Sequence, residues 1–311
     1  MTQNTEPLSG LYNTLAAADQ TYRKLPLRMR LEIEKISQGL SEFGPRKLGR
    51  SGMGTEFFEA REFRPDADDP RKINARLSAR AGRQIIIEKE AEIRQHFFLW
   101  RDATASMDYS SGRADYTKKQ AAEIMLLAFA KHLARNEEMI GILDQKGLYR
   151  GGKAAGHLAA QLFNDVAIIA GADLPRLERR LPRHSTTILF SDFLSQPEEI
   201  DKTLAQMTRH DLKGFLVMVL DPQEITFDYK GHIKFRGIEG EGEMTLKKAE
   251  KKRDAYLEKL RTHIEKIENI CRAKGFSLII QRTDEPLQNA LLSIYGLGQK
   301  NTATKEKILG L

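Results

Sequence analysis

Short apolar runs alternate with longer amphipathic segments over the last two thirds of the chain. The apolar runs predict strands at Phe97–Trp100, Met139–Leu143, Thr186–Phe190, Phe215–Leu220 and Ser277–Ile280. The segments between and after them predict helices at about Asp115–Ala134, Gly156–Asn164, Pro197–Arg209, Thr245–Lys274 and Glu285–Tyr295. Continuously apolar strands that are separated by helices are typical of a parallel sheet covered on both faces. We therefore predict a fold of the α/β class.

The first third of the chain has a different pattern. Apolar residues recur among charged ones up to about Phe43, which favours helix. The stretch that follows is interrupted by glycine and proline, and Gln84–Ile87 is its clearest predicted strand. We expect four parts: an N-terminal helical segment (1–43), a Gly/Arg-rich module with short strands (44–94), an α/β domain (95–298) and a flexible tail (299–311).

Composition narrows the class of protein. The 311 residues are 41% hydrophobic and 30% charged, as in a folded, soluble chain. No stretch approaches the roughly 20 apolar residues of a membrane-spanning helix, and the N-terminus does not resemble a secretory signal. The single cysteine, Cys271, excludes an internal disulfide and lies on an apolar stripe, so we interpret it as a core residue. A reducing compartment fits this composition, and we expect the cytoplasm.

The net charge of +7 raises the question of an acidic partner. Arginines crowd residues 46–83, although acidic residues are interleaved with them. A solvated surface is the plainest explanation, and an acidic protein or a nucleic acid is the alternative. The segment contains no recognisable base-reading motif, and its aromatic residues do not form the pattern of a stacking platform. Nucleic-acid binding through residues 46–83 is therefore the second hypothesis.

Polar residues follow the predicted strands, and two of these ends carry candidate chemistry. The first strand is followed by the stretch Asp102-Ala103-Thr104-Ala105-Ser106, and a later strand by Ser191-Asp192. In open α/β sheets ligands bind outside the carboxyl ends of the strands. Carboxylate and hydroxyl oxygens are ligands that Mg²⁺ or Mn²⁺ prefers. The candidate metal ligands are Asp102, Thr104, Ser106 and Asp192. The same residues would also serve as helix caps, and the residues alone leave both interpretations open.

Other sequence motifs for catalysis are weak. The segment Gly147–Lys153 matches a phosphate-binding loop, but Ala154 stands where the Mg²⁺-binding hydroxyl belongs, so we expect a glycine-rich turn. The chain has no G-x-S-x-G motif, and its histidines lack metal-ligand spacing. A hydrolase at the predicted strand ends would need a general base, for which His157 is the candidate. This is the third hypothesis.

The candidate metal motif belongs to a wider resemblance. D-x-[ST]-x-S after one strand, with S-D after a later one, resembles the metal-ion-dependent adhesion site of von Willebrand factor A domains. Upstream, Gly52–Pro65, Asp68–Asn74 and Ala79–Arg80 resemble the signature of domain-of-unknown-function family number 58, and Leu220–Glu224 resembles that family's D-P-x-E segment. The similarity covers about residues 40–297.

This resemblance implies a fold and a function. The implied fold is a von Willebrand factor A-like sandwich, and the implied function is that of a non-enzymatic adaptor. The implied partners are a MoxR-type AAA+ ATPase and its client complex. The signature residues assigned to partner binding are Glu56, Arg61, Asp68, Asp69, Arg71 and Arg80. The chain departs from the family pattern at Ala67, Asn74 and Ala75, and the third hydroxyl of a complete adhesion site has no clear match. These departures indicate a divergent member whose Mg²⁺ or Mn²⁺ site is incomplete.

Overall fold

The computed structural model describes residues 27–41, 59–65, 70, 73–88, 95–164, 173–177, 179–229, 231, 233–236, 243–246 and 248–296. The chain divides into two compact units. The small unit comprises residues 47–94, and the sheet unit comprises residues 1–46 with 95–311. Among the helices that the structure describes, none is long and apolar enough to cross a membrane.

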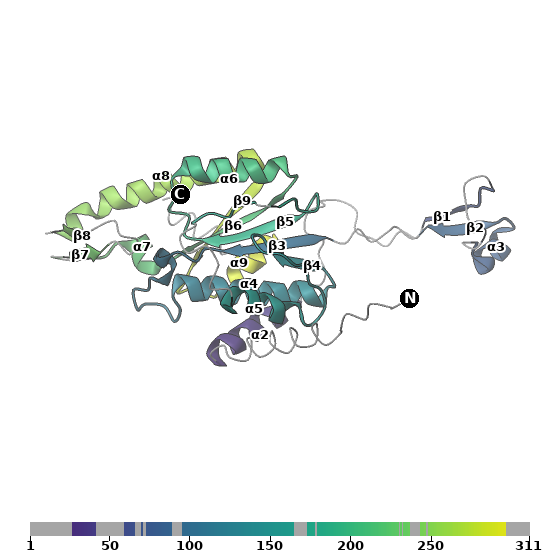
Figure 1. The fold of residues 1–311 in the computed structure, drawn as a ribbon, viewed down its shortest axis with the longest axis horizontal. Helices are drawn as coiled ribbons and strands as arrows, with labels where there is room; N and C mark the ends of the chain where they lie inside the picture. Colours follow the sequence, from purple (N-terminus) through teal and green to yellow (C-terminus); the bar gives the residue numbers. More distant parts are fainter. Residues whose placement is uncertain are drawn as a thin grey trace, which may run out of the picture. The chain divides into compact units, whose positions relative to one another are not determined.

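The sheet unit is built on a parallel β-sheet (Figure 1). Its strands are β3 (His96–Arg101), β4 (Met139–Ile142), β5 (Thr186–Ser191), β6 (Lys213–Leu220) and β9 (Phe276–Arg282). Their order across the sheet is β4-β3-β5-β6-β9, and each neighbouring pair is parallel. The predicted α/β class is confirmed, because each apolar run forms one of these strands within two residues of its predicted ends.

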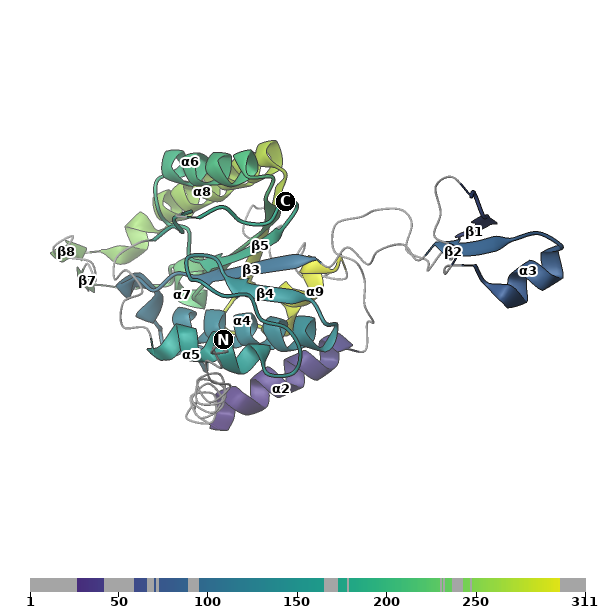
Figure 2. The same ribbon diagram turned by 45° about the vertical axis from the view of Figure 1, so that its right-hand side comes forward.

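Helices cover both faces of the sheet (Figures 1 and 2). One face carries α6 (Pro197–Arg209) and α8 (Arg253–Lys274), and the other carries α4 (Lys118–Arg135), α5 (Ala154–Asn164) and α9 (Gln288–Ile294). A further helix, α2 (Leu27–Ser41), packs on the outer side of α4. This arrangement explains the continuously apolar strands, since helices cover both faces of the sheet.

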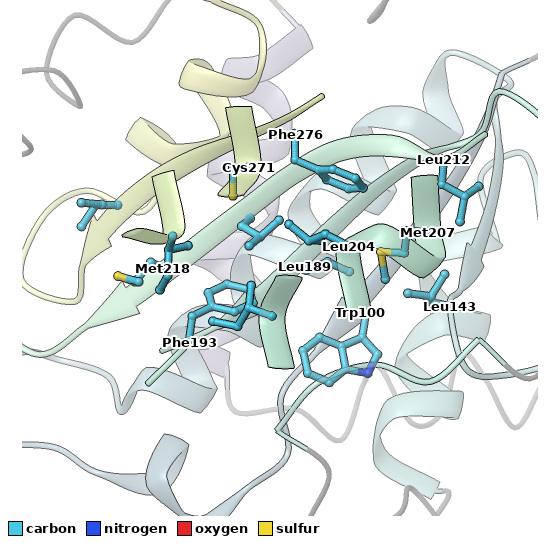
Figure 3. Packing of buried hydrophobic residues seen from close by; sticks show 14 of the residues in the cluster. Trp100, Leu143, Leu189, Phe193, Leu204, Met207, Leu212, Met218, Cys271 and Phe276 are labelled. Carbon is cyan, nitrogen blue, oxygen red and sulfur yellow. The ribbon is translucent and has the colours of Figure 1, made fainter. Parts of the chain in front are cut away.

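One hydrophobic cluster joins the sheet to α6 and α8 (Figure 3). Trp100 and Leu189 come from the sheet, and Leu204 and Met207 come from α6. The buried stripe of α8 consists of Leu260, Ile264, Ile267 and Cys271, at spacings of three and four residues. The interpretation of Cys271 as a core residue is therefore confirmed.

The helix α4 is enclosed on two sides, by the sheet and by α2. The Nη1 of Arg135 donates to the carbonyl oxygen of Ser37 at 3.1 Å, and Lys131 pairs with Glu34 of α2. Most of α4 is buried, including Lys118, Glu123 and His132. A helix that is buried nearly all round can keep such side chains only where partners or apolar packing accommodate them.

The predicted helix Thr245–Lys274 begins too early. Residues Glu243–Leu246 form strand β8, which pairs antiparallel with β7 (Ile233–Arg236), and α8 begins only at Arg253 after the 3₁₀ turn η3 (Ala249–Lys252). Met244 and Leu246 alternate with polar residues, which is the period of a strand. That short alternation was hidden by the longer helical pattern that follows it.

The glycine-rich segment after β4 is a turn, as predicted. Ile140 and Tyr149 form an antiparallel bridge, with their N–H groups donating to each other's carbonyl oxygens at 2.8 and 2.7 Å. Residues 147–153 contain turns and bends, and α5 begins at Ala154. The ring of His157 on α5 stacks on Tyr149, with 4.6 Å between centroids. This position makes His157 a packing residue of the turn.

The described part of the small unit contains an antiparallel pair of strands and one helix. Strand β1 (Glu59–Glu62) pairs antiparallel with β2 (Ile85–Glu88), and α3 (Ala75–Ala81) precedes β2. The side chain of Asn74 caps α3 by accepting a hydrogen bond from the N–H of Leu77 at 3.0 Å. The predicted strand near Gln84–Ile87 is found, shifted by one residue. The predicted tail, 299–311, lies outside the described residues.

Candidate functional site

The candidate site lies where the chain reverses its direction of travel across the sheet. From β3 the chain passes to β4 on one side, and later to β5 on the other side. The carboxyl ends of two such strands flank the crevice in which doubly wound α/β folds bind ligands. The loops at this edge, taken together with the first helical residues that follow two of them, are 102–106 after β3, 192–196 after β5 and 221–224 after β6. We call these loops the strand-end rim.

The first two loops of the strand-end rim are joined through Asp102. The hydroxyl of Ser191 donates to Oδ2 of Asp102 at 2.7 Å, and the N–H of Thr104 donates to Oδ1 at 2.7 Å. The N–H of Asp102 donates to the carbonyl oxygen of Phe190 at 2.8 Å. The side chain is fully buried. Burial raises the pKa of Asp102, while the hydrogen bonds from Thr104 and Ser191 oppose that rise.

The two predicted hydroxyl ligands lie together beside Asp102. The Oγ1 of Thr104 and the Oγ of Ser106 are 2.9 Å apart and share a hydrogen bond. Thr104 precedes the 3₁₀ helix η2 (Ala105–Asp108), but its side chain makes no capping hydrogen bond to it. Thr104 is buried, and Ser106 is half-buried. The structure thus brings three of the four predicted ligands into one turn of the chain.

The fourth predicted ligand, Asp192, faces a lysine. The Nζ of Lys118, the first residue of α4, donates to Oδ2 of Asp192 at 2.9 Å and to Oε1 of Glu224 at 2.7 Å. Lys118 is 1% exposed. Burial works against its charged form, but Glu224 and Asp192 outweigh that effect and raise the pKa of Lys118. Lys118 is therefore a buried ammonium group between two carboxylates.

The third loop of the strand-end rim holds Glu224 in place. Asp221 and Glu224 form a capping box at the start of the short helix α7 (Pro222–Thr226). Oε2 of Glu224 accepts from the N–H of Asp221 at 2.8 Å, which leaves Oε1 for Lys118. Oδ2 of Asp221 accepts from the N–H of Ser111 at 2.9 Å. The D-P-x-E segment is thus the element that delivers the second carboxylate to Lys118.

An aromatic side chain lies over the ammonium group. The ring centroid of Tyr109 is 5.8 Å from Nζ of Lys118, within the range of a cation–π contact. The hydroxyl groups of Tyr109 and Tyr229 are 2.8 Å apart and share a hydrogen bond. Burial raises the pKa of Tyr109. This phenol therefore stays neutral and serves to enclose Lys118.

Sequence reasoning found Asp102 and Asp192 but missed Lys118 and Glu224. A lysine at the start of a helix carries no sign of burial, because such positions are usually solvated. Glu224 was noticed only within the D-P-x-E segment of the family resemblance. The available signal was the capping box itself, since Asp followed three residues later by Glu marks a helix start at the end of β6.

The arrangement of these residues does not fit a divalent metal ion. The ammonium group of Lys118 already lies within hydrogen-bond distance of Asp192, one of the predicted ligands, and of Glu224. Both oxygens of Asp102 accept hydrogen bonds from protein donors. In the part of the chain that the structure describes, no group of three or more His, Cys, Asp and Glu residues could hold a metal. The Mg²⁺ or Mn²⁺ site stays a prediction, and this donor set argues against it.

The six residues predicted to bind a partner all belong to the small unit. Arg80 is exposed in the last turn of α3. Arg61 lies in β1, opposite Ile86 of β2. The remaining residues lie outside the described residues: Glu56, Asp68, Asp69 and Arg71.

Comparison with known proteins identifies the family. The family model described as "Protein of unknown function DUF58" matches residues 59–266, more than half of the chain. No curated protein matches the chain significantly. The chain belongs to the DUF58 family. The matched range includes the strand-end rim and the described part of the small unit after residue 58.

Proposed function

We propose that this member of the DUF58 family is a non-enzymatic adaptor that binds other proteins through the strand-end rim. The implied partners are a MoxR-type AAA+ ATPase and its client complex, in line with the resemblance of the signature segments. The rim resembles a metal-ion-dependent adhesion site, which is a protein-docking surface. The proposal excludes a reaction at the rim, and this makes it distinct from the hydrolase hypothesis.

The observation that supports a docking role is that the carboxylates of the strand-end rim bond to groups of the protein itself. Asp102 accepts from Thr104 and Ser191, and Glu224 accepts from Lys118. A catalytic carboxylate must reach a substrate proton or a reacting atom. Carboxylates that are buried and already bonded instead fix the loops of the rim. A rigid set of loops is what a docking surface requires, because less conformational entropy is lost on binding.

One loop of the rim also presents an apolar side chain. Leu194 is 47% exposed, and its N–H donates to Oδ1 of Asp192 at 3.3 Å. The preceding residue, Phe193, is buried, and its carbonyl oxygen lies 2.7 Å from Nε2 of His263 on α8. The loop is therefore anchored on both sides of its backbone, and Leu194 is held outward. This makes Leu194 the first candidate for a contact residue.

The proposal is tested by measuring the affinity of the purified chain for the MoxR-type AAA+ ATPase of the same organism. The variant Leu194→Asp should weaken binding by at least about tenfold, because a charge would replace an apolar contact. The matched control is Leu31→Asp, which changes a leucine on α2 that is 61% exposed and lies away from the rim. Absence of binding by the unmodified chain would contradict the proposal. Equal losses of affinity in both variants would show that the strand-end rim is not the binding surface.

The nucleic-acid hypothesis keeps some support from the small unit. Its described arginines with exposed side chains are Arg64, Arg76, Arg80 and Arg83. Arg83 pairs with Glu62 at 3.5 Å, so part of this charge is neutralised. Binding to phosphates would fall steeply with salt concentration. A gel-shift assay at low and at moderate salt distinguishes this hypothesis from the adaptor, which should show no shift.

A further inference from the structure

We propose that the ammonium group of Lys118 takes the place of a divalent cation at the strand-end rim, so that the rim is held together by a built-in, metal-independent cation. The ammonium group contacts loops from two different strands. Asp192 follows β5, and Glu224 follows β6. Lys118 itself comes from α4, which covers one face of the sheet. A single positive charge thus ties together three segments that are distant in sequence.

The position of Lys118 in its helix shows that the carboxylates hold it there. Lys118 is the first residue of α4, where the positive end of the helix dipole disfavours a cation. The N-terminus of α4 is capped by Thr117 and Gln120, and the ammonium group of Lys118, which has no acceptor, cannot contribute to that cap. A lysine that is 1% exposed at such a position requires compensation from elsewhere. Asp192 and Glu224 provide it.

The carboxylates depend equally on Lys118. Burial raises the pKa of Glu224, while Lys118 opposes that rise. Asp192 is 4% exposed, and the ammonium group of Lys118 is the cation that bonds to its Oδ2. A buried carboxylate without a cation is strongly destabilising. This is the role that a metal ion performs in a rim of the adhesion type, and here a side chain performs it.

The distances around Lys118 are those of an ammonium group bonded to carboxylates and differ from those of a metal site. A bound Mg²⁺ requires oxygen ligands at about 2.0–2.1 Å in a near-octahedral arrangement. The nitrogen–oxygen distances of 2.7 and 2.9 Å are those of charge-assisted hydrogen bonds. A divalent ion entering between Asp192 and Glu224 would meet the ammonium group at close range and be repelled by it. Binding would require Lys118 to leave a fully buried position.

The inference concerns the isolated protein and does not depend on the adaptor function. The first experiment measures Mn²⁺ and Mg²⁺ binding to the full chain by calorimetry, together with its melting temperature in a chelator and in excess metal. We expect no binding at millimolar metal and the same melting temperature in both conditions. Binding of one ion per chain that is lost in Asp192→Asn would overturn the inference.

A second experiment tests whether Lys118 acts as the counter-charge. Lys118→Met should lower the melting temperature by roughly 10 °C, because the buried Asp192 and the partly buried Glu224 lose their cation. The triple variant Lys118→Met, Asp192→Asn, Glu224→Gln has no such charges and should recover at least half of that loss. If Lys118→Met does not fold, the folding of the triple variant decides the test. The triple variant is expected to fold, because it has no carboxylate that lacks a cation at these positions. A triple variant that is no more stable than Lys118→Met would overturn the inference.

Discussion

The two ends of α4 bury ionisable side chains in opposite ways. Lys118, at the first residue, is 1% exposed and lies between two carboxylates, which raise its pKa. His132, near the last turn, is 2% exposed, and its ring packs against Phe129 and Tyr295. Burial lowers the pKa of His132 to about 4, and Arg135 contributes to this shift. The buried side chain at the first end is therefore charged and the one at the other end is neutral at physiological pH, and we call the two ends the charged end and the neutral end after these side chains.

The two ends of α4 therefore differ in kind: Lys118 is part of a group of paired charges, whereas His132 packs as a neutral ring. A buried charge is costly, and proteins keep one where it is paired and serves to fix a position. The charged end of α4 coincides with the strand-end rim, and the neutral end lies among aromatic residues. Between the two ends of α4, Glu123 forms an ion pair with a single arginine, Arg101, at 3.1 Å. Only the rim end places two carboxylates on one cation.

The largest expected effect is that of removing the charge at the rim end. Lys118→Met should lower the free energy of unfolding by about 3–5 kcal/mol at neutral pH, because it leaves the buried Asp192 and the partly buried Glu224 without a cation. Urea denaturation followed by circular dichroism measures this loss. A loss below that of an ordinary surface substitution would show that the carboxylates find other partners, and the contrast between the two helix ends would fail.

The second largest effect is expected at the neutral end of α4, where His132 should make the folded chain less stable at acidic pH. The unfolded chain protonates His132 near its ordinary pKa of 6.5, whereas the folded chain resists protonation down to about 4. The unfolded state then binds more protons, so stability falls as the pH falls through this window. Relative to His132→Phe, the wild-type chain should lose roughly 3 kcal/mol between about pH 7 and about pH 4. Urea denaturation at both pH values measures the loss, and parallel stability curves for the two proteins would contradict it.

The sequence predicts the fold of the sheet unit better than its site. The five strands could be predicted because a sheet covered on both faces needs continuously apolar strands, such as Phe97–Trp100. The convergence of Asp102 with Ser191-Asp192 could also be predicted, since both follow parallel strands. The burial of Lys118 could not, because it depends on how α4 and the D-P-x-E loop approach each other in space. Periodicity along one helix contains no information on that approach.

A smaller effect follows from removing one of the two carboxylates. Glu224→Gln keeps the capping box through its single amide oxygen, turns its amide N–H₂ towards Lys118 and leaves Lys118 paired with Asp192 alone, so it should cost about 1–3 kcal/mol at neutral pH. The pKa of Glu224 is raised in the folded state, which therefore binds more protons than the unfolded state above pH 4.5. The advantage of wild type over Glu224→Gln should accordingly shrink as the pH rises from acid to neutral. Urea denaturation across that range measures it.

The result for Glu224→Gln also tests how Asp192 and Glu224 share the ammonium group of Lys118. A loss as large as that of Lys118→Met would mean that Asp192 alone does not hold the ammonium group. An advantage of wild type that grows with pH would contradict the direction of the pKa shift. Either result would remove the distinction between a doubly paired lysine and an ordinary ion pair.

The smallest expected effect comes from the neighbouring residue of the same helix turn. Lys119 pairs with Asp108 at 3.3 Å, but their side chains are 30% and 59% exposed. Exposed ion pairs contribute little, so Lys119→Met should change the free energy of unfolding by less than about 1 kcal/mol, and added salt should remove the change. Urea denaturation at low and at high salt measures both points. Because Lys118 and Lys119 are the same residue type at adjacent positions, similar losses for the two substitutions would show that burial is not what distinguishes the charged end of α4.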